Sequence, residues 1–141
     1  MIKFRHVIFL GVLHFFSCVS PKQPPVSVRE KDFIDSIEKA FDGSAKREIS
    51  AALLGPGKEA EKKGSYGIHL LLPCDKLLEL SRDSPNIQKR SYFIAKHLYN
   101  GILAKDGSYA SIWISFSCDT SSSLYRDLVF RYEVDSLDSK N

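Results

Sequence analysis

The sequence predicts one small α+β domain, in which about three mostly antiparallel strands are covered on one face by helices. Two patterns predict this fold. Residues 109–118 and 128–135 alternate apolar and polar side chains, which is typical of strands with one buried and one exposed face. Residues 29–42 and 84–103 instead place apolar side chains three and four positions apart, as amphipathic helices do. The chain of 141 residues has room for one such domain, which we expect over residues 29–141.

Two helices are expected at the start of this domain. The first spans residues 29–42 and carries its apolar side chains on one stripe. Ser44 is a suitable N-cap for a second helix, with Ile49 and Leu53 on its apolar side and Gly55 at its end. The sequence therefore predicts a helical pair before the first strand.

The middle of the chain contains a strand followed by two helices. Residues 66–72 are almost continuously apolar, which predicts a strand in a central position or buried on both faces. Residues 73–82 are expected to form a short helix. Ser84 and Pro85 then mark the start of a longer helix, because proline is favoured at the first helical position. This helix is expected to end or bend near the Asn-Gly pair at 100–101.

The two alternating runs near the C-terminus predict an antiparallel hairpin. A polar, serine-rich segment separates them. In the second run Leu128, Phe130, Tyr132 and Val134 share one face, so we expect that strand to continue as far as residue 135.

The N-terminus has the layout of an export signal. Residues 1–6 are basic, and Val7 to Phe16 form an apolar run of about ten residues, which is too short to span a bilayer. Of the 20 basic and 17 acidic residues of the chain, Lys3 and Arg5 lie in this segment and no acid does. The rest of the chain is therefore close to neutral, which argues against a nucleic-acid partner.

The end of this segment reads Phe15-Phe16-Ser17-Cys18. It resembles the lipobox of bacterial lipoproteins, although Phe15 stands where that pattern usually has Leu, Val or Ile. The resemblance covers residues 1–18 only. It implies removal of residues 1–17 and attachment of fatty-acyl chains such as palmitate to Cys18, which would anchor the protein to a membrane. The alternatives are a cleaved secretory signal without lipid and an uncleaved N-terminal anchor.

Residues 18–28 are expected to form a tether between the lipid and the domain. Three prolines within this stretch favour an extended, semi-rigid spacer.

Cys74 and Cys118 are the two cysteines left over if Cys18 carries lipid. An even pair in an exported domain is expected to form a disulfide. The alternatives are two buried thiols that act as small apolar residues, and a reactive thiol served by His69 or His97.

No pattern in the sequence indicates a cofactor, a metal ion or a catalytic site, and we expect none. The metal-ligand candidates do not lie at the spacings of zinc or EF-hand sites. They are His69, Asp75, His97, Asp106 and Asp119. Residues 55–58, Gly-Pro-Gly-Lys, lack the first glycine and the final Ser or Thr of a phosphate-binding loop.

The expected contact surface is a strip of aromatic side chains made of Tyr109, Trp113 and the nearby Tyr125. Trp113 is the only tryptophan of the chain and alternates with Ile112 and Ile114, so it should lie on the face of the sheet away from the helices. Coverage of that face by another helix or by the tether is the alternative.

These observations predict a membrane-anchored protein of the bacterial envelope, on its periplasmic or cell-surface side, with a non-enzymatic binding or structural role. Its expected partners are the membrane, through the lipid, and another protein of the envelope or of a host. Two other functions remain open: a secreted, soluble effector or inhibitor without lipid, and a small thiol-dependent envelope enzyme.

Overall fold

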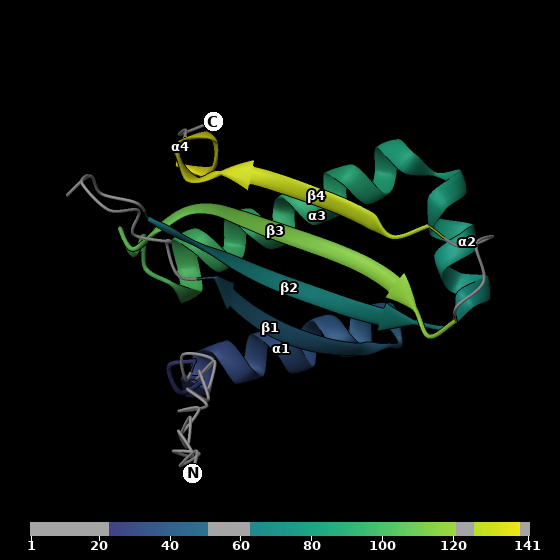
Figure 1. Ribbon diagram of the computed structural model, residues 1–141, viewed down its shortest axis with the longest axis horizontal. Coiled ribbons are helices and arrows are strands. Elements are labelled where there is room, and N and C mark those ends of the chain that lie inside the picture. The colour runs from purple at the N-terminus through teal and green to yellow at the C-terminus, as the bar shows by residue number, and fades with distance from the viewer. Residues whose placement is uncertain (1–22, 51–62, 121–125, 139–141) are drawn as a thin grey trace, which may run out of the picture.

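The computed structural model describes residues 23–50, 63–120 and 126–138 and confirms the α+β class (Figure 1). The described part of the chain forms a mixed sheet of four strands together with four α-helices and a π-helical turn, η1. The strands are β1 (Ser44–Ser50), β2 (Gly64–Leu72), β3 (Tyr109–Cys118) and β4 (Leu128–Glu133). The helical elements are α1 (Val28–Phe41), α2 (Cys74–Arg82), α3 (Ser84–His97), η1 (Leu98–Ile102) and α4 (Val134–Leu137).

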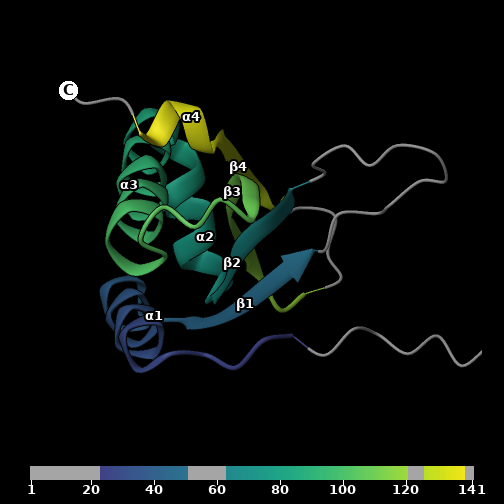
Figure 2. The same ribbon diagram turned by 90° about the vertical axis from the view of Figure 1, so that its left-hand side faces the viewer.

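The strands lie in the order β1-β2-β3-β4, and the helices lie on one face of the sheet (Figure 2). Strand β1 pairs antiparallel with β2, and β3 with β4, whereas β2 and β3 are parallel. Parallel neighbours need a long crossover connection, and here α2, α3 and η1 supply it. The predicted hairpin of the last two strands is thus confirmed, and the sheet has one strand more than expected.

The predicted helix beginning at Ser44 is wrong, because Ser44–Ser50 is an edge strand. Ala45, Arg47 and Ile49 are partly buried, while the residues between them are exposed. Arg47 therefore faces inward at a position where the sequence pattern would call for an apolar side chain. Residues 51–55, which completed the predicted helix, lie outside the described residues.

Helix α1 has a defined cap at each end. The Ser27 hydroxyl accepts a hydrogen bond from the Glu30 backbone N–H, and the Glu30 carboxylate accepts one from the Ser27 N–H, which is a capping box. At the other end Asp42 adopts a left-handed conformation with a φ of 52°. The chain turns there and enters β1 directly.

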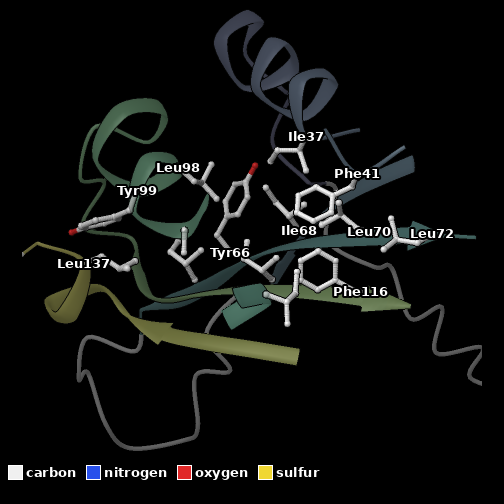
Figure 3. Close-up of a cluster of buried hydrophobic side chains, with 14 of the residues drawn as sticks. Ile37, Phe41, Tyr66, Ile68, Leu70, Leu72, Leu98, Tyr99, Phe116 and Leu137 are labelled. Atoms are coloured by element: carbon white, nitrogen blue, oxygen red, sulfur yellow. The ribbon is translucent and has the colours of Figure 1, made fainter. Parts of the chain in front are cut away.

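The core lies between the helices and the sheet (Figure 3). Phe41 of α1 contacts Phe116 of β3, with ring centroids 5.2 Å apart. Alternate residues of the two central strands supply most of the remaining buried side chains. They are Tyr66, Ile68, Leu70 and Leu72 in β2, and Ile112, Ile114 and Phe116 in β3.

The last predicted strand is two residues too long, because β4 ends at Glu133 and Val134 begins α4. Val134 and Leu137 are buried in the core. The Asn100 side-chain amide donates a hydrogen bond of 3.1 Å to the Leu137 carbonyl, which ties this last turn to η1. Among the described residues, no helix is both long enough and apolar enough to cross a membrane.

Candidate functional site

Cys74 and Cys118 form a disulfide, as the sequence predicts. Cys74 is the first residue of α2 and Cys118 the last residue of β3, and their Cα atoms lie 5.1 Å apart. The parallel register places Cys118 beside Leu72, two residues before Cys74, so the bond joins the start of the crossover to the strand that follows it. Both sulfur atoms are used in this bond, and neither is a free nucleophile.

His69 of β2 lies between two serines of the neighbouring strand. Its Nδ1 is 2.7 Å from the Ser115 Oγ, and its Nε2 is 2.8 Å from the Ser117 Oγ. The parallel register, which aligns His69 with Ser115, produces this arrangement. All three side chains belong to the face of the sheet that points away from the helices, which we call the outer face.

A neutral imidazole has one donor and one acceptor nitrogen. With such a ring, one serine hydroxyl donates a hydrogen bond to His69 and the other accepts one from it. A serine hydroxyl that donates a hydrogen bond to an imidazole nitrogen also has the geometry of a nucleophile next to its general base. Acyl transfer further requires donors aimed at the developing oxyanion. Strand β3 pairs with strands on both sides, so its backbone amides are engaged in the sheet. The arrangement is best explained as a satisfied polar cluster within the sheet.

The structure separates Tyr109 from Trp113, two of the three residues of the aromatic strip expected from the sequence. Trp113 lies on the outer face, and its indole covers Gly67, where an added Cβ would be 2.0 Å from the Trp113 Cε2. Tyr109 instead packs against the core, edge-on to Tyr66 with ring centroids 5.5 Å apart. A register shift between Gly64 and Ser65 breaks the alternation of β3 at this point. Tyr125 lies outside the described residues.

A buried polar cluster joins α1, β1 and β2. Glu30 Oε1 accepts hydrogen bonds from Arg47 Nη1, at 2.9 Å, and from the Tyr66 hydroxyl. Figure 3 shows the Tyr66 hydroxyl directed toward α1. Arg47 also donates to the Pro24 carbonyl, which fixes the chain just before α1. Burial, and then the hydrogen bond to Glu30, raise the pKa of Tyr66 well above its ordinary range.

Sequence reasoning missed this cluster, although one signal was available. Ser27 and Glu30 have the spacing of a capping box, which would have placed Glu30 at the third position of the helix. Nothing in the sequence pairs that carboxylate with Arg47, which is 17 residues away.

A groove with a volume of about 350 Å³ runs between α1 and α3. Its apolar lining includes the buried side chains Ile37 and Phe41, and Phe93, which is 56% exposed. Arg90 lies over the Phe41 ring, 4.2 Å from its centroid. The complete lining is Phe33, Ser36, Ile37, Ala40, Phe41, Arg90, Phe93, Ile94 and His97. Sequence reasoning missed this surface too, because the groove is lined by residues of two helices, α1 and α3.

The metal-ligand candidates are spread over the fold. Among the residues that the structure describes, no three His, Cys, Asp or Glu side chains gather as a metal site would require. The His97 ring contacts Phe33, with centroids 5.3 Å apart. Asp106 accepts hydrogen bonds from Ser108 in a turn, which lower the pKa of its carboxyl. Cys18, the predicted lipidation site, precedes the described residues.

The chain matches no protein-family model, no curated protein and no solved structure. Its function must therefore be inferred from its own residues.

Proposed function

We propose that this chain is an exported bacterial lipoprotein, held at a membrane through Cys18, whose domain binds a partner rather than catalysing a reaction. The anchoring half of the proposal depends on the signal-like segment and on the Ser17-Cys18 pair. The binding half depends on the groove between α1 and α3.

The groove is the observation that carries the binding role. Phe93 is 56% exposed at its edge, while the floor at Ile37 and Phe41 is recessed, with 4% and 5% exposure. A concave apolar surface with an exposed aromatic at its edge is typical of sites that desolvate a partner. The thiols that a thiol-dependent enzyme would need are joined in the Cys74–Cys118 disulfide.

Lipid anchoring is tested by growing the native host with an alkyne analogue of palmitate. We expect labelled protein in the membrane fraction, and an intact mass that corresponds to a chain beginning at Cys18 with two or three acyl groups. Cys18→Ala should abolish both the label and the sedimentation. An unlabelled, cleaved chain in the medium would instead establish the secreted effector or inhibitor.

Binding at the groove is tested by a photo-crosslinking amino acid, benzoyl-phenylalanine, placed at position 93 in the anchored protein. The matched control is the same substitution at Val129, which is 62% exposed on β4. We expect a discrete cross-linked protein at position 93 and none at position 129. Cross-links at position 129 alone would move the binding role to the outer face of the sheet.

A further inference from the structure

We infer that the groove between α1 and α3 accepts an amphipathic helix of a partner protein, whose apolar stripe is flanked by acidic residues. The inference rests on the proposed binding role and names the chemistry of the partner.

Each wall of the groove is a single helical stripe. Apart from Phe41 at the end of the helix, α1 contributes residues 33, 36, 37 and 40, and α3 contributes residues 90, 93, 94 and 97. Both sets have the spacing i, i+3, i+4, i+7, so each wall is about 10 Å long. Two neighbouring helices leave between them a furrow into which the side-chain ridge of a third helix can pack. A partner helix would insert apolar residues at the same spacing.

The charge of the rim favours an acidic partner. Arg90 lines the groove, while Lys96 and Arg29 line two neighbouring hollows that share His97 with it. None of these three cations pairs with a carboxylate within the described ranges. Arg90 lies over the Phe41 ring and Lys96 over the Tyr92 ring, at 4.2 and 5.7 Å. Helix α3 contains no acidic residue in its 14 positions. Asp32 lines the same hollow as Arg29 and offsets part of this charge.

The shape of the groove fits an inserted helix better than it fits a membrane surface. A helix that lies on a bilayer presents a convex apolar face to the lipid. Here Ile37 and Phe41 lie at the bottom of the furrow, and Phe93 is the one large apolar side chain that is strongly exposed among the lining residues. A flat lipid surface would reach Phe93 alone, whereas an inserted ridge reaches all three.

The test uses the full mature chain with Cys18→Ser and a fluorescent helical peptide of about four turns. The peptide carries Leu at i, i+3, i+4 and i+7 and Glu on the flanks, and its twin carries Lys in place of Glu. By fluorescence anisotropy at low salt, we expect the acidic peptide to bind about tenfold more tightly than its twin. This preference should weaken at physiological salt.

Substitutions of the basic residues Lys96 and Arg90 test whether charge sets the affinity for the acidic peptide. Lys96→Glu should reduce affinity for the acidic peptide about tenfold and improve binding of its twin. Arg90→Gln serves as a second rim variant. Lys46→Glu makes the same charge change as Lys96→Glu on an exposed residue of β1, away from the groove, and should leave both affinities unchanged. Circular dichroism confirms that each variant is folded.

Equal affinity for the two peptides, or an equal loss in Lys46→Glu, would overturn the inference. So would sedimentation with phosphatidylglycerol vesicles that depends on Lys96 in the absence of peptide binding, because the basic rim would then serve lipid. Suppose that a partner is cross-linked at position 93 but the two peptides bind with equal affinity. The proposed binding role would then stand, and only the inference of an acidic helical partner would be overturned. A chain that discriminates between the peptides but forms no cross-link in cells would challenge the proposed role instead.

Discussion

Glu30 and Arg47 form an ion pair inside the domain, with 2.9 Å between Glu30 Oε1 and Arg47 Nη1. Their side chains are 7% and 8% exposed, so the pair is almost fully removed from water. The Tyr66 hydroxyl and the Ser27 backbone N–H supply further hydrogen bonds to the same carboxylate. Removal of one partner would leave a buried charge without compensation.

Arg47→Ala is expected to destabilise the fold by about 3–5 kcal/mol, because Glu30 would remain buried without its cation. Urea denaturation followed by circular dichroism measures this loss. Lys76→Ala is the control: Lys76 pairs with Asp42 at 3.0 Å on the surface, where such pairs contribute about 1 kcal/mol or less. Similar losses in the two variants would mean that Arg47 is effectively solvated.

How much of the fold the sequence predicts depends on whether a pattern is local. Helix α1 and strand β3 carry complete apolar stripes, and both were located to within one or two residues. Strand β1 was missed because Arg47 occupies one of its three inward positions, and the partner that makes this burial favourable lies on another element. Because arginine is usually exposed, the sequence of β1 does not show the alternation of apolar and polar residues that predicts a strand.

The candidate sites also divide into features that a local sequence pattern predicts and features that depend on contacts between separate elements. The Cys74–Cys118 pair could be predicted because, once Cys18 is assigned to lipid, the two remaining cysteines allow one intramolecular pairing. The core-side position of Tyr109 could not be predicted, because it follows from a one-residue register shift against the neighbouring strand. The groove depends on how α1 and α3 lie side by side, and the sequence of either helix alone does not contain that information.

Loss of the disulfide should weaken the fold without changing its topology. The bond closes a loop with a sequence separation of 44, for which the chain-entropy relation gives about 4 kcal/mol. We expect Cys74→Ala/Cys118→Ala to lower the free energy of unfolding by up to this amount in urea denaturation. Reduction of the parent chain should reproduce the loss, and should have no effect on the double variant. Reduction that shifts both proteins equally would show that the bond is not formed in solution.

Gly67→Ala should displace Trp113 from the sheet. An added Cβ at Gly67 would be 2.0 Å from Trp113 Cε2, and β2 is paired with a strand on each side, so the indole is the group that has to move. We expect a loss of about 1–3 kcal/mol and a red shift in the emission of this single tryptophan as it enters water. Gly107→Ala is the matched control, since an added Cβ there meets nothing within 4 Å. An unshifted emission spectrum in Gly67→Ala would contradict the placement of the indole.

Phe93→Ser should leave the stability of the domain almost unchanged, within about 0.5 kcal/mol, because its side chain is 56% exposed. Phe41→Ala, at the floor of the same groove, should cost about 3–5 kcal/mol because that ring is buried. Thermal unfolding of the two variants measures the contrast. A large loss in Phe93→Ser would show that Phe93 supports the fold and is not available to a partner.

Tyr66 should resist ionisation in the folded protein. Burial and the Glu30 carboxylate raise its pKa far above the ordinary value near 10, so the folded chain keeps a proton that the unfolded chain releases. Stability should therefore fall as the pH rises above about 10, since only the unfolded state loses that proton there. Titration of phenolate absorbance tests this. Tyr66→Phe should reduce the signal of the denatured chain by one tyrosine in six and leave the native titration below the alkaline transition unchanged. A native titration that also loses one tyrosine in this variant would mean that the Tyr66 hydroxyl is open to water and that its contact with Glu30 does not persist in solution.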